Sequence, residues 1–265
     1  MLANVPEFCT EEMADHSFAL LLSIVRQLPA MHQAVIDGRW TSSRLQCVSI
    51  PRLRGTTIGL IGFGASGRAT AVRAAAFGMQ VLANRSDMSD ADGAAAAARV
   101  PLLPLHELLP QCDFISLHLP LTSTNKHFLG AAEFAAMKPG AILINTSRGS
   151  LVDEPALVAA LESGQLGGAG IDCFERIQLH GDDGAPTADQ HLGLPAMENV
   201  ALTPHVAAYS QGAMEEVGEK GILNLIAALR GRLPTHEHIV NPSVVQRWEE
   251  RFGLAPPLLG ASPKL

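Results

Sequence analysis

Six short, continuously apolar runs recur along the chain, and they limit the folds it can adopt more than any other feature. Strands that are apolar at every position are typical of a parallel sheet that is buried on both faces. Helix-like segments lie between the runs, and this alternation predicts a doubly wound α/β fold. The runs cover residues 57–61, 80–83, 114–117, 141–144, 169–171 and 200–202, and the helical segments cover 65–77, 93–99, 131–137 and 153–163.

Two longer helical patterns flank this core. The first covers residues 11–28, with Thr10 as its expected N-cap, and the second covers 211–230 and is closed by Gly231. We therefore expect an arm over 1–28, a cofactor-binding domain over 29–240 and a tail over 241–265, with a short helix after Pro242.

The composition excludes several classes of protein. With 265 residues, 47% of them hydrophobic and 17% charged, the chain is long and apolar enough to bury a core. Its net charge of −7 makes it a poor partner for a nucleic-acid backbone. Its most apolar stretch, 18–25, is too short to cross a membrane, and four cysteines without metal-ligand spacing favour a reducing cytoplasm.

The strongest local motif is the glycine loop at 62–67, which follows the first strand and opens a helix. Gly62 suits the tight turn, Gly64 lets a pyrophosphate approach the backbone, and Gly67 lets the helix pack closely on the strand. Together with Ala65 and Ser66, the opening turn of the helix offers N–H groups to phosphate. The loop predicts dinucleotide binding.

The end of the second strand bears on which dinucleotide is bound. An acidic residue at this point selects the ribose hydroxyl of NAD, whereas an arginine accepts the 2′-phosphate of NADP. Here Asn84, Arg85 and Ser86 come first, and no acid occurs before Asp87. We expect NADP(H) to be favoured, with NAD(H) possible.

Polar residues follow three later strands, at 145–149, 172–175 and 203–207. With the glycine loop and the segment 116–122, their order and spacing resemble the D-isomer-specific 2-hydroxyacid dehydrogenases. That family includes glyoxylate/hydroxypyruvate reductase, phosphoglycerate dehydrogenase and the C-terminal binding protein corepressors. The resemblance runs from about residue 5 to 242 and implies a Rossmann-type cofactor domain.

The resemblance also implies roles for individual residues. Arg148 would bind the carboxylate of a small 2-keto acid, and His205 would protonate its carbonyl oxygen. Asp172 would hold the nicotinamide side of the cofactor. The cofactor cleft would also be lined by His118, Leu119, Pro120, Thr122, Thr146, Ser147 and Ala207, beside Arg148 and His205 themselves.

One position departs from the family pattern. The family has a glutamate, the partner of the histidine, five residues after the aspartate that Asp172 matches, and this chain has Ile177 there. Glu175 is the nearest replacement, and His180, Asp182 or Asp183 could also reach His205. This departure predicts a reductase that is slow or works best at lower pH.

Most of the family's N-terminal substrate domain has no counterpart in the 265 residues, since the match begins almost at Met1. Three interpretations follow: an NADP(H)-dependent 2-keto acid reductase, a non-catalytic dinucleotide-binding or regulatory protein, and a structural subunit that pairs with another chain. We further expect no metal site, and a homodimer through the cofactor domain and the helix at 11–28.

Overall fold

The structure is a computed structural model that describes residues 2–40, 50–89, 93–175, 194, 197–235 and 238–253. It divides into two compact units, which we describe separately. The sheet unit is Met13–Ala207, and the terminal unit combines Met1–Glu12 with Ala208–Leu265. The boundaries expected at residues 28 and 240 do not coincide with these units. One reason is that the helix expected to form an arm contributes Phe18 and Leu21 to the core of the sheet unit.

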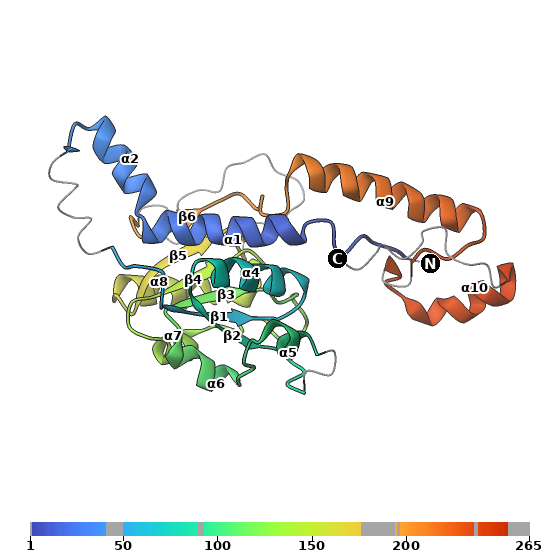
Figure 1. Ribbon diagram of the computed structural model, residues 1–265, viewed down its shortest axis with the longest axis horizontal. Coiled ribbons are helices and arrows are strands. Elements are labelled where there is room, and N and C mark those ends of the chain that lie inside the picture. The colour runs from blue at the N-terminus through green and yellow to red at the C-terminus, as the bar shows by residue number, and fades with distance from the viewer. Residues whose placement is uncertain are drawn as a thin grey trace. The chain divides into compact units, whose positions relative to one another are not determined.

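A six-stranded, all-parallel sheet forms the centre of the sheet unit, in the order β2-β1-β3-β4-β5-β6 (Figure 1). This confirms the predicted Rossmann-type α/β fold. Three strands have the predicted bounds, and the other three are longer than predicted. The strands are β1 (Thr57–Ile61), β2 (Gln80–Asn84), β3 (Phe114–Leu117), β4 (Ala141–Asn145), β5 (Leu166–Ile171) and β6 (Val200–Leu202).

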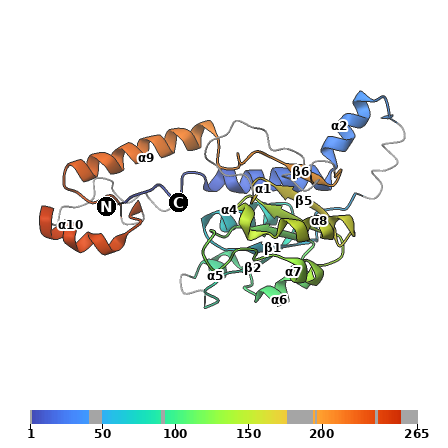
Figure 2. The same ribbon diagram turned by 180° about the vertical axis from the view of Figure 1, so that it is seen from behind.

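Helices cover both faces of the sheet, which explains why the strands are apolar at successive positions. Ile58 and Leu60 of β1 join the core cluster that contains residues of α1 (Thr10–Val25) and α4 (Ala65–Ala76). Ile61 belongs to the opposite cluster, together with residues of α6 (Leu105–Leu108), α7 (Ala131–Ala136) and α8 (Glu154–Glu162). Figures 1 and 2 show α1 and α4 on one side of the sheet and α6 and α7 on the other.

Shorter helices complete this unit, and their positions follow the predicted segments. Asp153 caps α8 by accepting a hydrogen bond from the Ala156 backbone N–H at 3.2 Å. The remaining elements of the unit are α5 (Ala94–Ala98), α6 (Leu105–Leu108), η2 (Leu109–Gln111), α7 (Ala131–Ala136), η3 (Gly149–Leu151) and α8 (Glu154–Glu162).

Helix α1 lies unusually close to β5, because two glycines of that strand have no side chain. A Cβ on Gly170 would lie 2.8 Å from the Cβ of Leu20, and a Cβ on Gly168 would lie 2.7 Å from Ile24 Cγ2. Both distances are shorter than van der Waals contact allows. The polar residues of α1 are therefore held within reach of the sheet edge.

The single helix expected over 11–28 is wrong at its C-terminal end. Helix α1 starts at Thr10 and stops at Val25, because Gln27 adopts a left-handed conformation with φ 51°. A second helix, α2 (Leu28–Ile36), then starts with Pro29 in its first turn, where proline's missing N–H costs nothing.

The terminal unit contains α9 (Gln211–Leu229), η7 (Pro242–Val244) and α10 (Val245–Phe252). The Ser210 hydroxyl caps α9 by accepting from the Ala213 N–H at 2.9 Å, and Gly231 follows the helix with φ 69°. Gly231 therefore closes the helix as predicted, and α10 is the short helix expected after Pro242.

A buried polar network also lies in the terminal unit. His238 is 3.0 Å from both Asn224 Oδ1 and Glu7 Oε1, and Lys220 Nζ donates to Glu7 Oε1 at 2.7 Å. The Asn224 amide in turn donates to the Asn4 carbonyl at 3.1 Å. This network ties the N-terminal residues of the unit to α9 and to the segment that follows it.

No described helix is by itself long and apolar enough to cross a membrane. Helices α1 and α2 meet that criterion only together, as a pair bent by 55°.

Candidate functional site

The carboxyl ends of all six strands form one row across the sheet. Ladder pairing places the last residue of each strand opposite the last residue of its neighbour. Across the sheet this row reads Asn84, Ile61, Leu117, Asn145, Ile171 and Leu202. Nearly all of the predicted site residues lie just beyond it, within a few positions of a strand end. The structure therefore brings together, at one edge, segments as far apart in the sequence as the glycine loop at 62–67 and the loop at 203–207.

The chain reverses its direction across the sheet between β1 and β3, where open α/β sheets bind ligands. The loop after β1 contacts the segment after β3 at this point. His118 N–H donates to the Ile61 carbonyl at 2.7 Å, and a Cβ on Gly62 would overlap the His118 carbonyl. A Cβ on Gly67 would overlap the Gly62 carbonyl in the same way. These two glycines are required by the packing of the loop itself.

Gly64 differs from both neighbouring glycines of the loop. Its φ is −75°, which any residue can adopt, and a Cβ there would meet nothing within 4 Å. The protein's own packing therefore gives no reason for a glycine at this position. It caps α4, whose first N–H groups have no partner within the helix. The open space at Gly64 and the free amides of α4 fit the pyrophosphate of a dinucleotide.

His118 lies buried beneath this loop. Burial lowers the pKa of its imidazole to about 4, so the ring is neutral near pH 7. Its Nε2 lies 3.0 Å from Ser116 Oγ, while Nδ1 has no hydrogen-bond partner among the described residues. The predicted lining residues that follow form a folded turn: Asn125 accepts from the Thr122 N–H and donates to the Pro120 carbonyl.

Arg85 directly follows β2 and is half-buried, and Ser86 beside it is exposed. The Asn84 side-chain amide donates to the Leu103 carbonyl at 2.9 Å. The Asn84 carbonyl accepts from the Gly62 N–H at 2.8 Å, which ties the glycine loop to the end of β2.

The turn after β4 presents Arg148. Asn145 is buried and braces this turn from within, since it accepts from the Ser147 N–H at 3.0 Å and donates to the Arg148 carbonyl at 2.9 Å. The Arg148 side chain is exposed, and its guanidinium donates only to the Ser147 carbonyl at 2.6 Å. No acidic partner occurs for it among the described residues. A cation held in this way can bind a carboxylate.

Next to this turn, Cys173 donates from Sγ to the Ser147 carbonyl at 3.3 Å. Burial raises the pKa of this thiol to about 12. The thiol is therefore protonated at neutral pH and is not a nucleophile.

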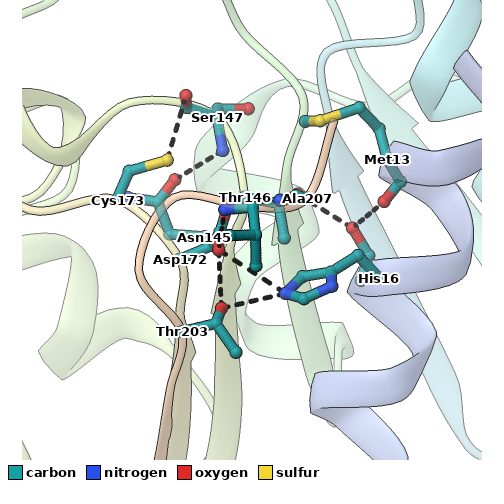
Figure 3. A network of polar contacts seen from close by, with 11 residues as sticks. Met13, His16, Asn145, Thr146, Ser147, Asp172, Cys173, Thr203 and Ala207 are labelled. Atoms are coloured by element: carbon teal, nitrogen blue, oxygen red, sulfur yellow. Dashed lines mark hydrogen bonds and ion pairs between the residues drawn. The ribbon is translucent and has the colours of Figure 1, made fainter. Parts of the chain in front are cut away.

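The loop after β6 presents His205, and Asp172 holds that loop. The Asp172 carboxylate is fully buried and accepts hydrogen bonds from Thr203 Oγ1 at 2.6 Å and from the N–H groups of Val206 and Ala207 at 2.9 and 3.0 Å (Figure 3). These bonds bracket His205, a half-buried residue with φ 57°. The expected contact of Asp172 with nicotinamide stays a prediction.

Glu175 does not pair with His205 in the structure. Its carboxylate contacts Lys126 Nζ at 2.8 Å and His127 Nε2 at 2.9 Å, and these partners hold its pKa below the usual range although burial opposes them. That Glu175 replaces the missing partner of His205 stays a prediction, and in the structure its carboxylate pairs with Lys126 and His127. Ile177, His180, Asp182 and Asp183 lie outside the described residues.

Sequence reasoning missed two polar residues of α1 that reach the same edge. His16 Nε2 lies 2.9 Å from Thr203 Oγ1, and Ser17 Oγ lies 2.9 Å from Thr146 Oγ1 (Figure 3). Their signal was present, because Ser17 interrupts the apolar face that α1 turns toward the core. Among the described residues, no group of three or more His, Cys, Asp or Glu side chains could hold a metal ion.

Comparison with known proteins identifies the family. The model of the D-isomer specific 2-hydroxyacid dehydrogenase NAD binding domain matches residues 18–207. The chain belongs to this family. Residues 18–207 run from within α1 through the His205 loop, so the 2-hydroxyacid dehydrogenase match includes the loops after all six strands, while His16 and Ser17 lie just before it.

Individual relatives agree with this result. A glyoxylate reductase of Thermococcus litoralis is 36% identical over 92% of this chain and 71% of its own length. A glycerate dehydrogenase of Methylorubrum extorquens is 36% identical over 87% of this chain and 69% of its own. Among solved structures, an acyclic imino acid reductase (Bsp5) in complex with NADPH and D-Arg has a TM-score of 0.75, with 29% identity over 91% of this chain and 71% of that one.

Proposed function

We propose that this 2-hydroxyacid dehydrogenase homologue binds NADP(H) and reduces a small 2-keto acid of the glyoxylate or hydroxypyruvate type. One arrangement carries the proposal. Two buried polar residues, Asn145 and Asp172, hold Arg148 and His205 at the same sheet edge as the glycine loop. Related chains at about 36% identity are a glyoxylate reductase and a glycerate dehydrogenase, which supports this substrate class.

The chemistry assigned to the chain's own residues is simple. Arg148 binds the substrate carboxylate through its guanidinium, which has no competing carboxylate among the described residues. His205 donates a proton to the carbonyl oxygen from a ring nitrogen and takes it back in the reverse direction. When bound, the nicotinamide supplies a hydride to the carbonyl carbon.

The preference for NADP(H) is part of the proposal. Arg85 at the end of β2 would receive the 2′-phosphate, and the amides of the first turn of α4 would receive the pyrophosphate. The NADPH complex of the related imino acid reductase supports a fold able to accept this cofactor. NAD(H) is the alternative. We expect Arg85→Ala to raise the Kd of NADPH about tenfold and to leave the Kd of NADH unchanged.

The decisive experiment separates binding from turnover. We would titrate the chain with NADPH and NADH by fluorescence, and then follow NADPH oxidation with glyoxylate and with hydroxypyruvate. We expect binding of NADPH and turnover that falls about 100-fold in His205→Asn. Failure to bind either dinucleotide would reject the proposal entirely.

Gly64 provides a test of the cofactor position. Gly64→Val is expected to weaken NADPH binding by more than about tenfold while the chain stays folded, since the new side chain enters open space that the phosphates need. Gly218→Val is the matched control, because a Cβ at Gly218 in α9 also meets nothing within 4 Å. Equal effects of the two substitutions would argue against a phosphate at Gly64.

A second function, dinucleotide binding without turnover, is favoured by Ile177 at the family's glutamate position. Binding of NADPH with no oxidation by either keto acid would select it. Ile177→Glu then tests the cause. Under the first proposal this substitution raises kcat/KM at neutral pH, and an already high, broad pH profile in wild type would show that no glutamate is needed.

We further propose a cytoplasmic homodimer that pairs through the cofactor domain and α1. Exposed apolar residues of the adjoining segment, Val35, Ile36 and Trp40, support an association of this kind. Sedimentation equilibrium of the wild-type chain tests the dimer.

A further inference from the structure

Helix α1 carries two polar residues whose purpose the proposed function leaves open. Ser17 is almost fully buried among apolar neighbours, and His16 beside it keeps about a fifth of its side chain exposed. Burying a polar group is costly unless it is hydrogen-bonded. Both residues satisfy this requirement at the edge that holds Arg148 and His205.

The hydrogen bonds of His16 have a definite direction. Both carboxylate oxygens of Asp172 accept from backbone N–H groups, and Thr203 donates its single hydroxyl proton to Oδ1 at 2.6 Å. Thr203 Oγ1 must then accept from His16 Nε2 at 2.9 Å, which assigns a proton to that nitrogen. The same nitrogen lies 3.5 Å from Asp172 Oδ1, so the ring also adds favourable electrostatics to a buried carboxylate.

This series of hydrogen bonds, from His16 through Thr203 to Asp172, ends on the backbone beside His205. Asp172 accepts from Val206 and Ala207, and these N–H groups lie directly after His205. His205 itself has φ 57°, a conformation that a side-chain-bearing residue holds only when its surroundings impose it. The contacts from His16 through Thr203 and Asp172 hold the backbone at His205 in this conformation.

Ser17 makes the equivalent connection to the other loop. Its hydroxyl donates to the Met13 carbonyl at 2.8 Å, so it accepts from Thr146 Oγ1 at 2.9 Å. Thr146 precedes the turn that presents Arg148. Two consecutive residues of one helix therefore contact the two loops that carry the proposed substrate-binding and proton-donating groups.

We propose that His16 and Ser17 are positioning residues that set the His205 and Arg148 loops relative to each other. The assigned action is mechanical and electrostatic, and neither residue contacts substrate. This inference rests on the proposed function for its catalytic meaning, but its structural content can be measured without turnover.

The first test uses hydrogen exchange of the Val206 and Ala207 amides, followed by NMR. His16→Leu keeps the volume and removes the donor, and we expect exchange at both amides to rise about tenfold. His16→Gln places an amide N–H where Nε2 lies and is expected to restore exchange to within about threefold of wild type. His106→Leu is the matched control, because His106 is an exposed histidine of the same unit.

Unchanged exchange in His16→Leu would overturn the proposal. Should that variant fail to fold, His16→Asn replaces it, since its shorter amide ends nearer the backbone than Nε2 does. Exchange in His16→Asn at the wild-type rate would overturn the proposal equally.

The second test measures kcat, KM and the pH profile of kcat. We expect His16→Leu to lower kcat for glyoxylate about tenfold and to shift the pH profile of kcat, with the Kd of NADPH changed less than twofold and recovery in His16→Gln. Ser17→Ala is expected to raise KM for glyoxylate, because it releases the loop of Arg148. A wild-type chain that binds NADPH without reducing a keto acid would reject the proposed function, while the exchange rates would still decide the role of His16.

Discussion

Each of the two units buries a histidine, and the surroundings of the two rings differ. His118 in the sheet unit has one ring nitrogen near Ser116 and one without a partner among the described residues, and burial lowers its pKa to about 4. His238 in the terminal unit has the oxygens of Asn224 and Glu7 at its two nitrogens. Because Asn224 uses its amide for the Asn4 carbonyl, its side-chain oxygen faces His238 and accepts from Nδ1.

The comparison shows two ways to stabilise a buried polar group. The sheet unit keeps His118 neutral beneath the glycine loop, next to the place proposed for negatively charged phosphates. The terminal unit instead builds an ionic network of Glu7, Lys220 and His238. The two units should therefore respond to acid over different pH ranges.

The largest expected effect concerns the sheet unit. Because the pKa of His118 falls from 6.5 to about 4 on folding, protonation favours the unfolded chain. The free energy of unfolding should fall by about 3 kcal/mol as the pH drops from 6.5 to 4. Urea unfolding followed by the Ile115 methyl resonance measures this, and His118→Gln should remove most of the pH dependence.

Wild type and His118→Gln with equal pH dependence would mean that His118 titrates normally. The Ile239 methyl resonance, read in the same samples, reports the terminal unit and serves as an internal control.

An intermediate effect is expected from Asn224→Leu. It leaves the Nδ1–H of His238 and the Asn4 carbonyl without their partner, which should cost the terminal unit about 2 kcal/mol. Asn224→Asp is the matched variant, since it keeps an acceptor for His238 and should cost less. A loss below about 0.5 kcal/mol in Asn224→Leu would show that water replaces both bonds.

The smallest effect concerns Glu7. Burial alone would raise its pKa, but hydrogen bonds from Lys220 and His238 lower it to about 2. The ionised form therefore contributes stability above pH 4.5, and this contribution is lost as the pH falls toward 2. Since 39% of the side chain is exposed, we expect Glu7→Gln to cost about 1 kcal/mol at pH 7.

Unfolding curves of wild type and Glu7→Gln, read at Ile239, should converge near pH 2 to 3. A constant difference across the whole pH range would assign the effect to packing instead of charge.

The sequence predicts the sheet well for a physical reason. Short, continuously apolar runs between helical segments have few alternatives to a buried parallel strand, and 57–61, 114–117 and 200–202 match to the residue. The break at Gln27 was missed because Arg26 and Gln27 continue a helical pattern, and only Pro29 marks the new helix. A left-handed conformation at a residue other than glycine leaves little trace in sequence.

The candidate site also has residues that the local sequence predicts and residues that it does not. The glycine loop, Arg148 and His205 have local signatures that are readable over a few residues. For His16 and Ser17 the local sequence shows only that a serine interrupts an apolar helix face, because their partners Thr203 and Thr146 are 187 and 129 positions away. The partners of Glu175 were likewise not predictable from sequence. Its carboxylate pairs with Lys126 and His127, which lie in a loop distant in the sequence.

The contact between His16 and Thr203 also has a consequence in time. During synthesis His16 of α1 emerges before its polar partner Thr203, which is added 187 residues later. At about 5 to 20 residues per second, α1 waits roughly 10 to 40 seconds before the His205 loop exists. Until then, His16 lacks its partner, although β5 is already complete at Ile171. The edge of the sheet is therefore completed late in synthesis, because the loop that carries His205 is its last segment.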